Sequence, residues 1–270
     1  MLDFDQLREL TVLRRACVDS RTADTNRLKA LARRFVGWEA GAEEQKRQQR
    51  CAVANEVAGV VMNGGVAPIG QESACLALVE FGGLIGATIE ALNVYIRALE
   101  KRIEALVKPE AIWMKWGGPI RGLGIQNLAT LLAEAGNPGN YPKKGHLWKR
   151  FGLHLNGEGR AARATRGEKL DFSPFRRSHA IVAAGCLLRS GNEHYRALYD
   201  ARRAVTAERY PDWTKGHSHN DAQRIVAKRL LLDLWRAWRA AAGEDALGPE
   251  PADEAIAASP TLRRYVEELS

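Results

Sequence analysis

A chain of 270 residues with 46% hydrophobic side chains can bury one large core or two smaller ones, which excludes wholesale disorder. No segment approaches the ~18–20 uninterrupted apolar residues of a membrane span. The acidic start, Met-Leu-Asp-Phe-Asp, lacks the pattern of a signal peptide. Four widely spaced cysteines, with no pair at metal-ligand spacing, are typical of reduced thiols. We therefore expect a cytoplasmic protein without a membrane partner.

The net charge of +8 is concentrated in one part of the chain. Residues 1–140 carry 17 Lys/Arg and 16 Asp/Glu, residues 141–240 carry 21 and 9, and residues 241–270 carry 2 and 7. The basic residues are densest in 143–177, which holds ten of them and three acidic ones. A localised positive field attracts a polyanion, and counterion release supplies affinity for it.

The first part of the chain is predicted to be helical. Apolar residues at helical spacing indicate one helix over residues 4–35 and a second over 42–61. The Gly- and Pro-containing segment 63–70 then interrupts the helical pattern.

The clearest periodicity follows this interruption. Leu78, Ile85, Leu92, Leu99 and Leu106 repeat every seven residues, and an interleaved isoleucine set lies between them. Such a stripe favours a two-stranded parallel coiled coil, with the partner helix either in the same chain or in another. We expect a homodimer or higher oligomer through the coiled coil. The predicted oligomerisation residues are Ile89, Leu92, Ile96, Leu99, Ile103 and Leu106.

The sequence thus predicts a mainly α fold in three parts. Residues 1–110 form a long coiled-coil arm that ends at Pro109, and 111–240 form a compact helical domain. The acidic residues 241–270 form a loosely attached tail with a short helix over 261–269.

A helix-hairpin-helix-like element is predicted at the start of the compact domain. Gly122 and Gly124 allow a tight turn before a helix that ends near Ala135. The first N–H groups of that helix, with its dipole, can hold a phosphate without reading a base. Arg121 adds a charge beside the turn.

The run from Ile120 to Leu153 resembles the opening of the C-terminal domain of the bridge-RNA-guided insertion-sequence transposases, relatives of the pilin-gene invertase. The matching positions are Gly122-Leu123-Gly124, Leu131-Leu132-Ala133-Glu134, Gly136-Asn137, Tyr141 and Gly152-Leu153. Looser similarity extends over residues 10–240. The resemblance implies a part in DNA transposition or recombination, with DNA and structured RNA as partners.

The catalytic residues of that family have no clear counterparts in this sequence. The family's RuvC-like Asp-Glu-Asp-Asp domain precedes the region of resemblance, so a divalent metal is expected only if a RuvC-like partner supplies its ligands. The family's serine would fall near residues 159–161, which are Gly-Arg-Ala. Ser173 and Ser178 are weak candidates for a displaced nucleophile. We therefore expect no independent catalysis and no cofactor.

Other polar and aromatic residues allow further interpretations. His217 and His219, with His194 upstream, are candidate metal ligands on an extended loop. A capped loop before a helix that begins at Asp221 is the simpler interpretation. Trp148 lies within a basic run and is a candidate for stacking on bases.

These observations predict a nucleic-acid-binding protein related to the C-terminal part of a transposase. The predicted nucleic-acid contacts are Arg121, Gly122, Gly124, Lys143, Lys144, Trp148, Lys149, Arg150, Arg176 and Arg177. Two alternatives remain open at this point. One is an active DNA recombinase that depends on a serine nucleophile and works with a separately encoded RuvC-like partner. The other is a coiled-coil regulator of a full-length transposase.

Overall fold

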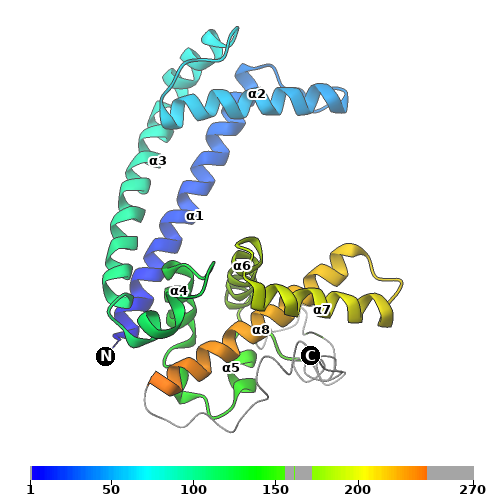
Figure 1. The fold of residues 1–270 in the computed structure, drawn as a ribbon. Helices are drawn as coiled ribbons and strands as arrows, with labels where there is room; N and C mark the ends of the chain where they lie inside the picture. The colour runs from blue at the N-terminus through cyan, green and yellow to red at the C-terminus, as the bar shows by residue number, and fades with distance from the viewer. Residues whose placement is uncertain (1, 156–160, 162–171, 242–270) are drawn as a thin grey trace. The chain divides into compact units, whose positions relative to one another are not determined.

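A computed structural model describes residues 2–155, 161 and 172–241, and these residues are mainly helical (Figure 1). The predicted mainly α fold is therefore confirmed. An isolated antiparallel bridge joins Leu155 and Ala161. The predicted helix over 261–269 and all but the first residue of the predicted acidic tail lie outside the described residues.

The chain forms two compact units. One comprises residues 9–102, and the other comprises residues 1–8 together with the chain from 103 onward. One division falls within the helix Phe4–Phe35 and the other within the helix Glu72–Val107, which is before the boundary predicted at residue 110. The ring of Phe4 lies 5.4 Å from that of Trp238, which explains why the first turn belongs to the second unit.

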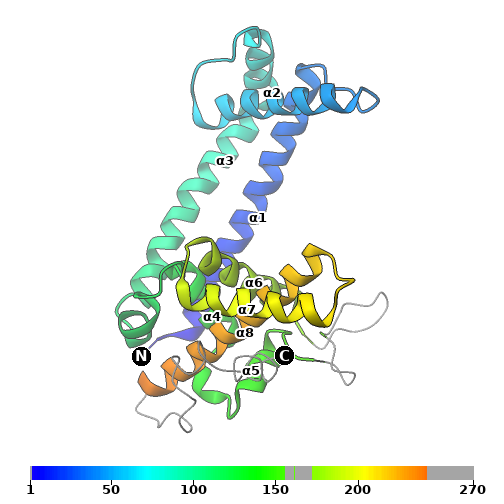
Figure 2. The same ribbon diagram turned by 45° about the vertical axis from the view of Figure 1, so that its right-hand side comes forward.

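The first unit contains most of α1 (Phe4–Phe35), all of α2 (Glu44–Asn63) and most of α3 (Glu72–Val107). α1 and α3 run side by side in opposite directions (Figures 1 and 2). Arg14 donates to Glu100 at 2.6 Å, and Arg21 donates to Asn93 at 3.1 Å, which fixes this antiparallel register. α2 packs where α1 ends and α3 begins, and it contributes Ala54, Val57 and Ala58 to the core that the three helices share.

The heptad stripe of α3 is largely buried within the chain. Ile89, Ile96, Leu99 and Ile103 are buried, and Leu92 and Leu106 are partly buried. The stripe therefore packs inside one chain, where α1 runs antiparallel to α3. This is the same-chain alternative, and the parallel pairing expected from the Ile/Leu pattern is absent from the described chain. The hydrophobic period correctly placed the buried stripe, but it could not identify the partner helix.

The first half of α3 also exposes apolar side chains. Leu76, Val79, Phe81 and Leu84 are exposed, with Leu84 reaching 87%. By length and composition alone, α3 is able to cross a membrane, which the sequence analysis did not anticipate, and 28% of its most apolar 18-residue window is buried. A helix that is apolar on more than one face usually packs on more than one side.

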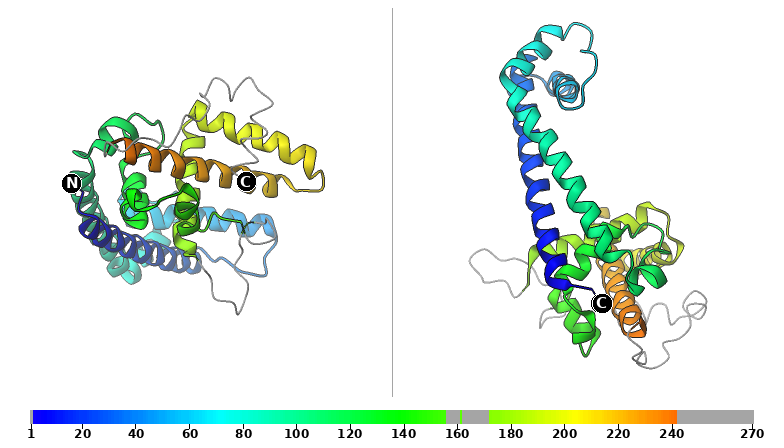
Figure 3. Two further views of the ribbon diagram at one scale, coloured as in Figure 1. Left: turned by 90° about the horizontal axis from the view of Figure 1, so that it is seen from below. Right: turned by 90° about the vertical axis from the view of Figure 1, so that its left-hand side faces the viewer.

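The second unit is built around the last helix. Its elements are η1 (Trp113–Gly117), α4 (Ile125–Ala135), η2 (Pro138–Asn140), α5 (Lys144–Arg150), α6 (Pro174–Arg189), α7 (Glu193–Arg209) and α8 (Lys215–Ala241). α8 packs against α5, α6, α7 and η2. Figure 3 shows α7 and α8 lying side by side, joined by a short turn.

Hydrogen bonds from buried polar groups fix α8 in this arrangement. The indole N–H of Trp235 donates to the carbonyl of Tyr141 at 2.9 Å. The carboxylate of Asp233 accepts from the Tyr195 hydroxyl at 2.9 Å and from Arg229 at 2.7 Å. Burial raises the pKa of Asp233, and the Arg229 charge opposes this rise.

Candidate nucleic-acid interface

The predicted glycine turn is present and lies against the end of α6. Gly122 has φ +94°, a conformation that favours glycine. A Cβ at this position would overlap the side chain of Ser190, so the close approach also requires glycine. The carbonyl of Arg121 accepts from the Ser190 hydroxyl at 3.1 Å and from the Asn192 amide at 3.2 Å.

The helix after the turn starts as predicted. α4 begins at Ile125 and ends at Ala135, with Gly124 as its N-cap and no side-chain capping bond. The space beside Gly124 is open, since a Cβ there would meet nothing within 4 Å. The segment before the turn is a five-residue π-helix, η1, rather than a regular α-helix. The second half of the predicted element is therefore formed, with the exposed Arg121 beside it.

Three of the predicted arginine contacts interact within the fold. Arg150 donates to the backbone carbonyl of Glu134 at 3.0 Å, and Arg176 donates to the Glu134 carboxylate at 2.7 Å. Arg177 donates to the Gly152 carbonyl and lies 3.8 Å from the ring centroid of Phe172. Carbonyls and carboxylates near the C-terminus of a helix attract guanidinium groups, which explains the first two pairings. Arg150, Arg176 and Arg177 are therefore partly buried and have partners within the fold, and their contact with nucleic acid stays a prediction.

Trp148 is a core residue rather than an exposed stacking platform. Its side chain is 7% exposed, and its indole N–H donates to the carbonyl of Lys228 at 3.0 Å. The ammonium groups of Lys228 and Lys144 lie 4.3 and 5.5 Å from its ring. The neighbouring Leu147 and Phe151 are also buried, so α5 turns its apolar side toward α8. The predicted role of Trp148 in base stacking is therefore wrong.

Two lysines at α5 are exposed, Lys143 at its N-cap and Lys149 near its end, and Lys144 is partly buried. Arg121 and Gly124 are the other predicted contact residues that are exposed.

Behind α5, Lys228 is buried among other charged side chains. It is 3% exposed, and its pKa is lowered to about 7, mainly by burial and then by Arg224, Arg202 and Lys144. Asp221 counters this effect, and it pairs with Arg202 at 2.5 Å and with Arg224 at 3.3 Å.

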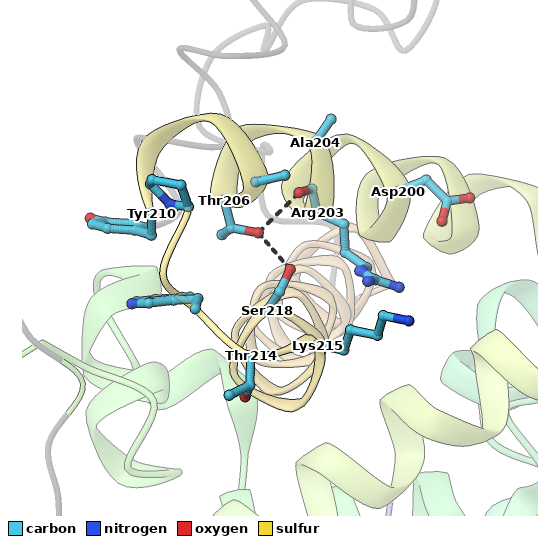
Figure 4. Close-up of a pocket in the computed structure, with 11 residues that line it drawn as sticks. Asp200, Arg203, Ala204, Thr206, Tyr210, Thr214, Lys215 and Ser218 are labelled. Carbon is cyan, nitrogen blue, oxygen red and sulfur yellow. Dashed lines mark hydrogen bonds between the residues drawn. The ribbon is translucent and has the colours of Figure 1, made fainter.

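Sequence reasoning missed a pocket at the turn between α7 and α8 (Figure 4). The pocket has a volume of about 420 Å³, and Arg203, Thr206, Lys215 and Ser218 are among its lining residues. The Thr206 and Ser218 hydroxyls lie 2.7 Å apart at its buried side. The Tyr-Pro-Asp-Trp run at 210–213 was a signal in the sequence, because aromatic residues in a turn rarely belong to a core.

The histidines do not assemble a metal site. His217 and His219 lie on α8 rather than on an extended loop, and His219 pairs with the Tyr199 hydroxyl at 2.7 Å. The backbone N–H of His217 donates to the Thr214 hydroxyl at 3.2 Å. The helix thus begins at Lys215, upstream of the start expected at Asp221, and the expected loop is the first part of α8. Within residues 2–155, 161 and 172–241, no three His, Cys, Asp or Glu side chains are grouped to hold a metal ion.

The candidate serines occupy ordinary positions at the start of α6. Ser173 directly precedes the helix, and Ser178 is exposed on it. The region where the transposase serine would fall, residues 159–161, lies outside the described residues except for Ala161. A catalytic role for Ser173 or Ser178 stays untested.

No protein-family model matches the chain, and no curated protein and no solved structure matches it.

Proposed function

We propose that the second unit is a nucleic-acid-binding module that holds the sugar-phosphate backbone of DNA, and of structured RNA, without strand-transfer chemistry of its own. The observation that carries this proposal is the exposure of Lys143 and Lys149 within residues 141–240, where basic side chains outnumber acidic ones by 21 to 9. Exposed lysines supply point contacts to phosphates, and the field behind them attracts the polyanion.

The charge distribution and the transposase resemblance support the same class of ligand. Residues 141–240 have a net charge of +12, from 21 basic and 9 acidic side chains. Arg121 and the open start of α4 would add a backbone phosphate contact of the kind that carries no sequence information. The proposed place of action is the cytoplasm, in DNA transposition or recombination.

Charge reversal of the two exposed lysines tests this proposal. In 0.1 M salt, Lys143→Glu combined with Lys149→Glu is expected to weaken binding of a 20-base-pair DNA duplex by about 10–100-fold. The plot of log K against log salt should become flatter by about 2, because two phosphate contacts are lost. Fluorescence anisotropy across a salt series measures both quantities.

The control makes the same change of net charge in the first unit. Lys101→Glu with Arg102→Glu alters two exposed cations of α3 and should leave duplex affinity within about threefold. Equal binding by the α5 variant and the wild-type chain at all salt concentrations would refute the proposal.

We also propose that two copies of the chain associate through the outer face of α3 instead of its heptad stripe. This face exposes Leu76, Val79 and Leu84. The area of exposed apolar surface carries this proposal, because Arg97 in the second half of the helix already pairs with Glu90 at 3.4 Å. A second copy would cover the apolar side chains of the first half.

Lysine substitutions on this outer face should separate the two copies. Leu76→Lys with Leu84→Lys is expected to convert a dimer into a monomer in sedimentation equilibrium, without loss of helical content. Val182→Lys, at an exposed valine of α6, is the matched control and should stay dimeric. A wild-type chain that is monomeric at 50–100 µM, or that sediments only with lipid vesicles, contradicts self-association through this face.

A further inference from the structure

The turn between α7 and α8 presents aromatic rings to solvent. Trp213 is 38% exposed, and its ring stacks on Tyr210 with centroids 4.4 Å apart and an interplanar angle of 11°. The guanidinium carbon of Arg209 lies 5.6 Å from the Tyr210 ring. A preformed stack holds the indole in place, so a ligand that stacks on it loses little side-chain entropy.

Positive and polar groups line the pocket beside this stack. Figure 4 shows the Arg203 and Lys215 side chains on one side of the pocket and Tyr210 on the other, with the Thr206 and Ser218 hydroxyls between them. The carboxylate of Asp200 also lines the pocket, but Arg196 pairs with it at 2.8 Å. The charge that remains for a ligand is therefore positive.

These features together match the parts of one nucleotide. The exposed indole offers a face for a base, and the two cations can neutralise a phosphate. The buried hydroxyls of Thr206 and Ser218 bond to each other at 2.7 Å, and Thr206 donates to the Arg203 carbonyl at 3.0 Å, so they fix the floor of the pocket. The volume of about 420 Å³ lies within the ~300–1,000 Å³ range of small-ligand pockets.

We propose that this pocket binds one unpaired nucleotide of a single-stranded nucleic acid. A base inside a duplex is stacked on both faces and cannot reach the indole, whereas an unpaired base can. The inference rests on the proposed nucleic-acid binding. It adds a preference of the second unit for single-stranded or extruded nucleotides to the proposed binding of phosphates.

The test compares two probes with the full-length chain. One probe is a 20-nucleotide single-stranded oligodeoxynucleotide and the other is a fully paired 20-base-pair duplex. Trp213→Ala is expected to weaken binding of the single strand about tenfold and to change duplex binding less than twofold. Trp213→Phe should retain most of the single-strand affinity, because a phenyl ring still stacks.

Two further variants separate a local effect from a general one. Arg203→Gln with Lys215→Gln should flatten the salt dependence of single-strand binding by about 1.4, as expected for two lost contacts to a single strand. Tyr95→Ala, at an exposed aromatic residue of α3, is the matched control and should bind both probes like the wild-type chain. Melting curves followed by circular dichroism show whether each variant is folded.

The outcomes distinguish this inference from the proposed function. Duplex binding by the wild-type chain with no effect of Trp213→Ala on the single strand overturns the pocket and leaves the phosphate-binding proposal standing. An equal loss of both probes in a folded Trp213→Ala variant also overturns it. Binding of neither probe by the wild-type chain overturns both proposals.

Discussion

Replacing Trp148 with alanine is expected to lower the free energy of unfolding by about 3–5 kcal/mol, the usual cost of removing a buried aromatic side chain. The indole fills the contact between α5 and α8 and donates a hydrogen bond to the Lys228 carbonyl. Its loss leaves a cavity and also uncovers the ammonium of Lys228, which lies 4.3 Å from the ring. Urea denaturation followed by circular dichroism measures the change.

The effect can be divided between packing and hydrogen bonding. Trp148→Phe keeps an aromatic ring but loses the N–H donor and part of the volume, so we expect a smaller loss of about 1–2 kcal/mol. Tyr95→Ala serves as the control, because loss of this exposed ring should cost less than about 0.5 kcal/mol. A Trp148→Ala variant that is as stable as the control would show that the indole is not part of the core.

The helices were predictable because their signals are local. Apolar spacing placed α1 at residues 4–35 and predicted a helix that ends near Ala135, as the structure shows. The partner of the α3 stripe was not predictable, since Ile96 and Leu99 bury equally well against α1 or against a second chain. The antiparallel contacts of Arg14 with Glu100 and of Arg21 with Asn93, 86 and 72 residues apart, identify the neighbour.

The candidate interface was predictable only in part, because charge in a sequence does not say which way a side chain turns. Lys143 and Lys149 are exposed as expected. Arg176, in the same basic region, pairs with Glu134, and the 42 residues between them hide this pairing from any local pattern. The aromatic stack at the α7–α8 turn was missed for the opposite reason: Tyr210 and Trp213 are close in sequence, but their exposure depends on where the two helices end.

Replacing Lys228 with methionine is expected to stabilise the chain most at neutral and acidic pH. The pKa of Lys228 falls from 10.5 to about 7 on folding, mainly because burial disfavours the ammonium. Below pH 7 both the folded and the unfolded chain carry the proton, so the full penalty applies. Between about pH 7 and 10.5 the folded chain releases the proton while the unfolded chain keeps it, and the stability of the wild-type chain rises with pH across this window.

Methionine keeps the aliphatic packing against Trp148 and has no charge to desolvate. The gain in the free energy of unfolding at pH 6 should therefore be several kcal/mol, up to about 5 kcal/mol at 1.36 kcal/mol for each pKa unit. It should shrink toward zero as the pH approaches 10.5, because the lysine is then neutral in both states. Urea titrations of both chains from pH 6 to 10 measure this difference, with Lys149→Met as the exposed control. A Lys228→Met chain that is less stable than the wild type at pH 6 would mean that the surroundings of Lys228 stabilise its ammonium and that burial does not lower its pKa.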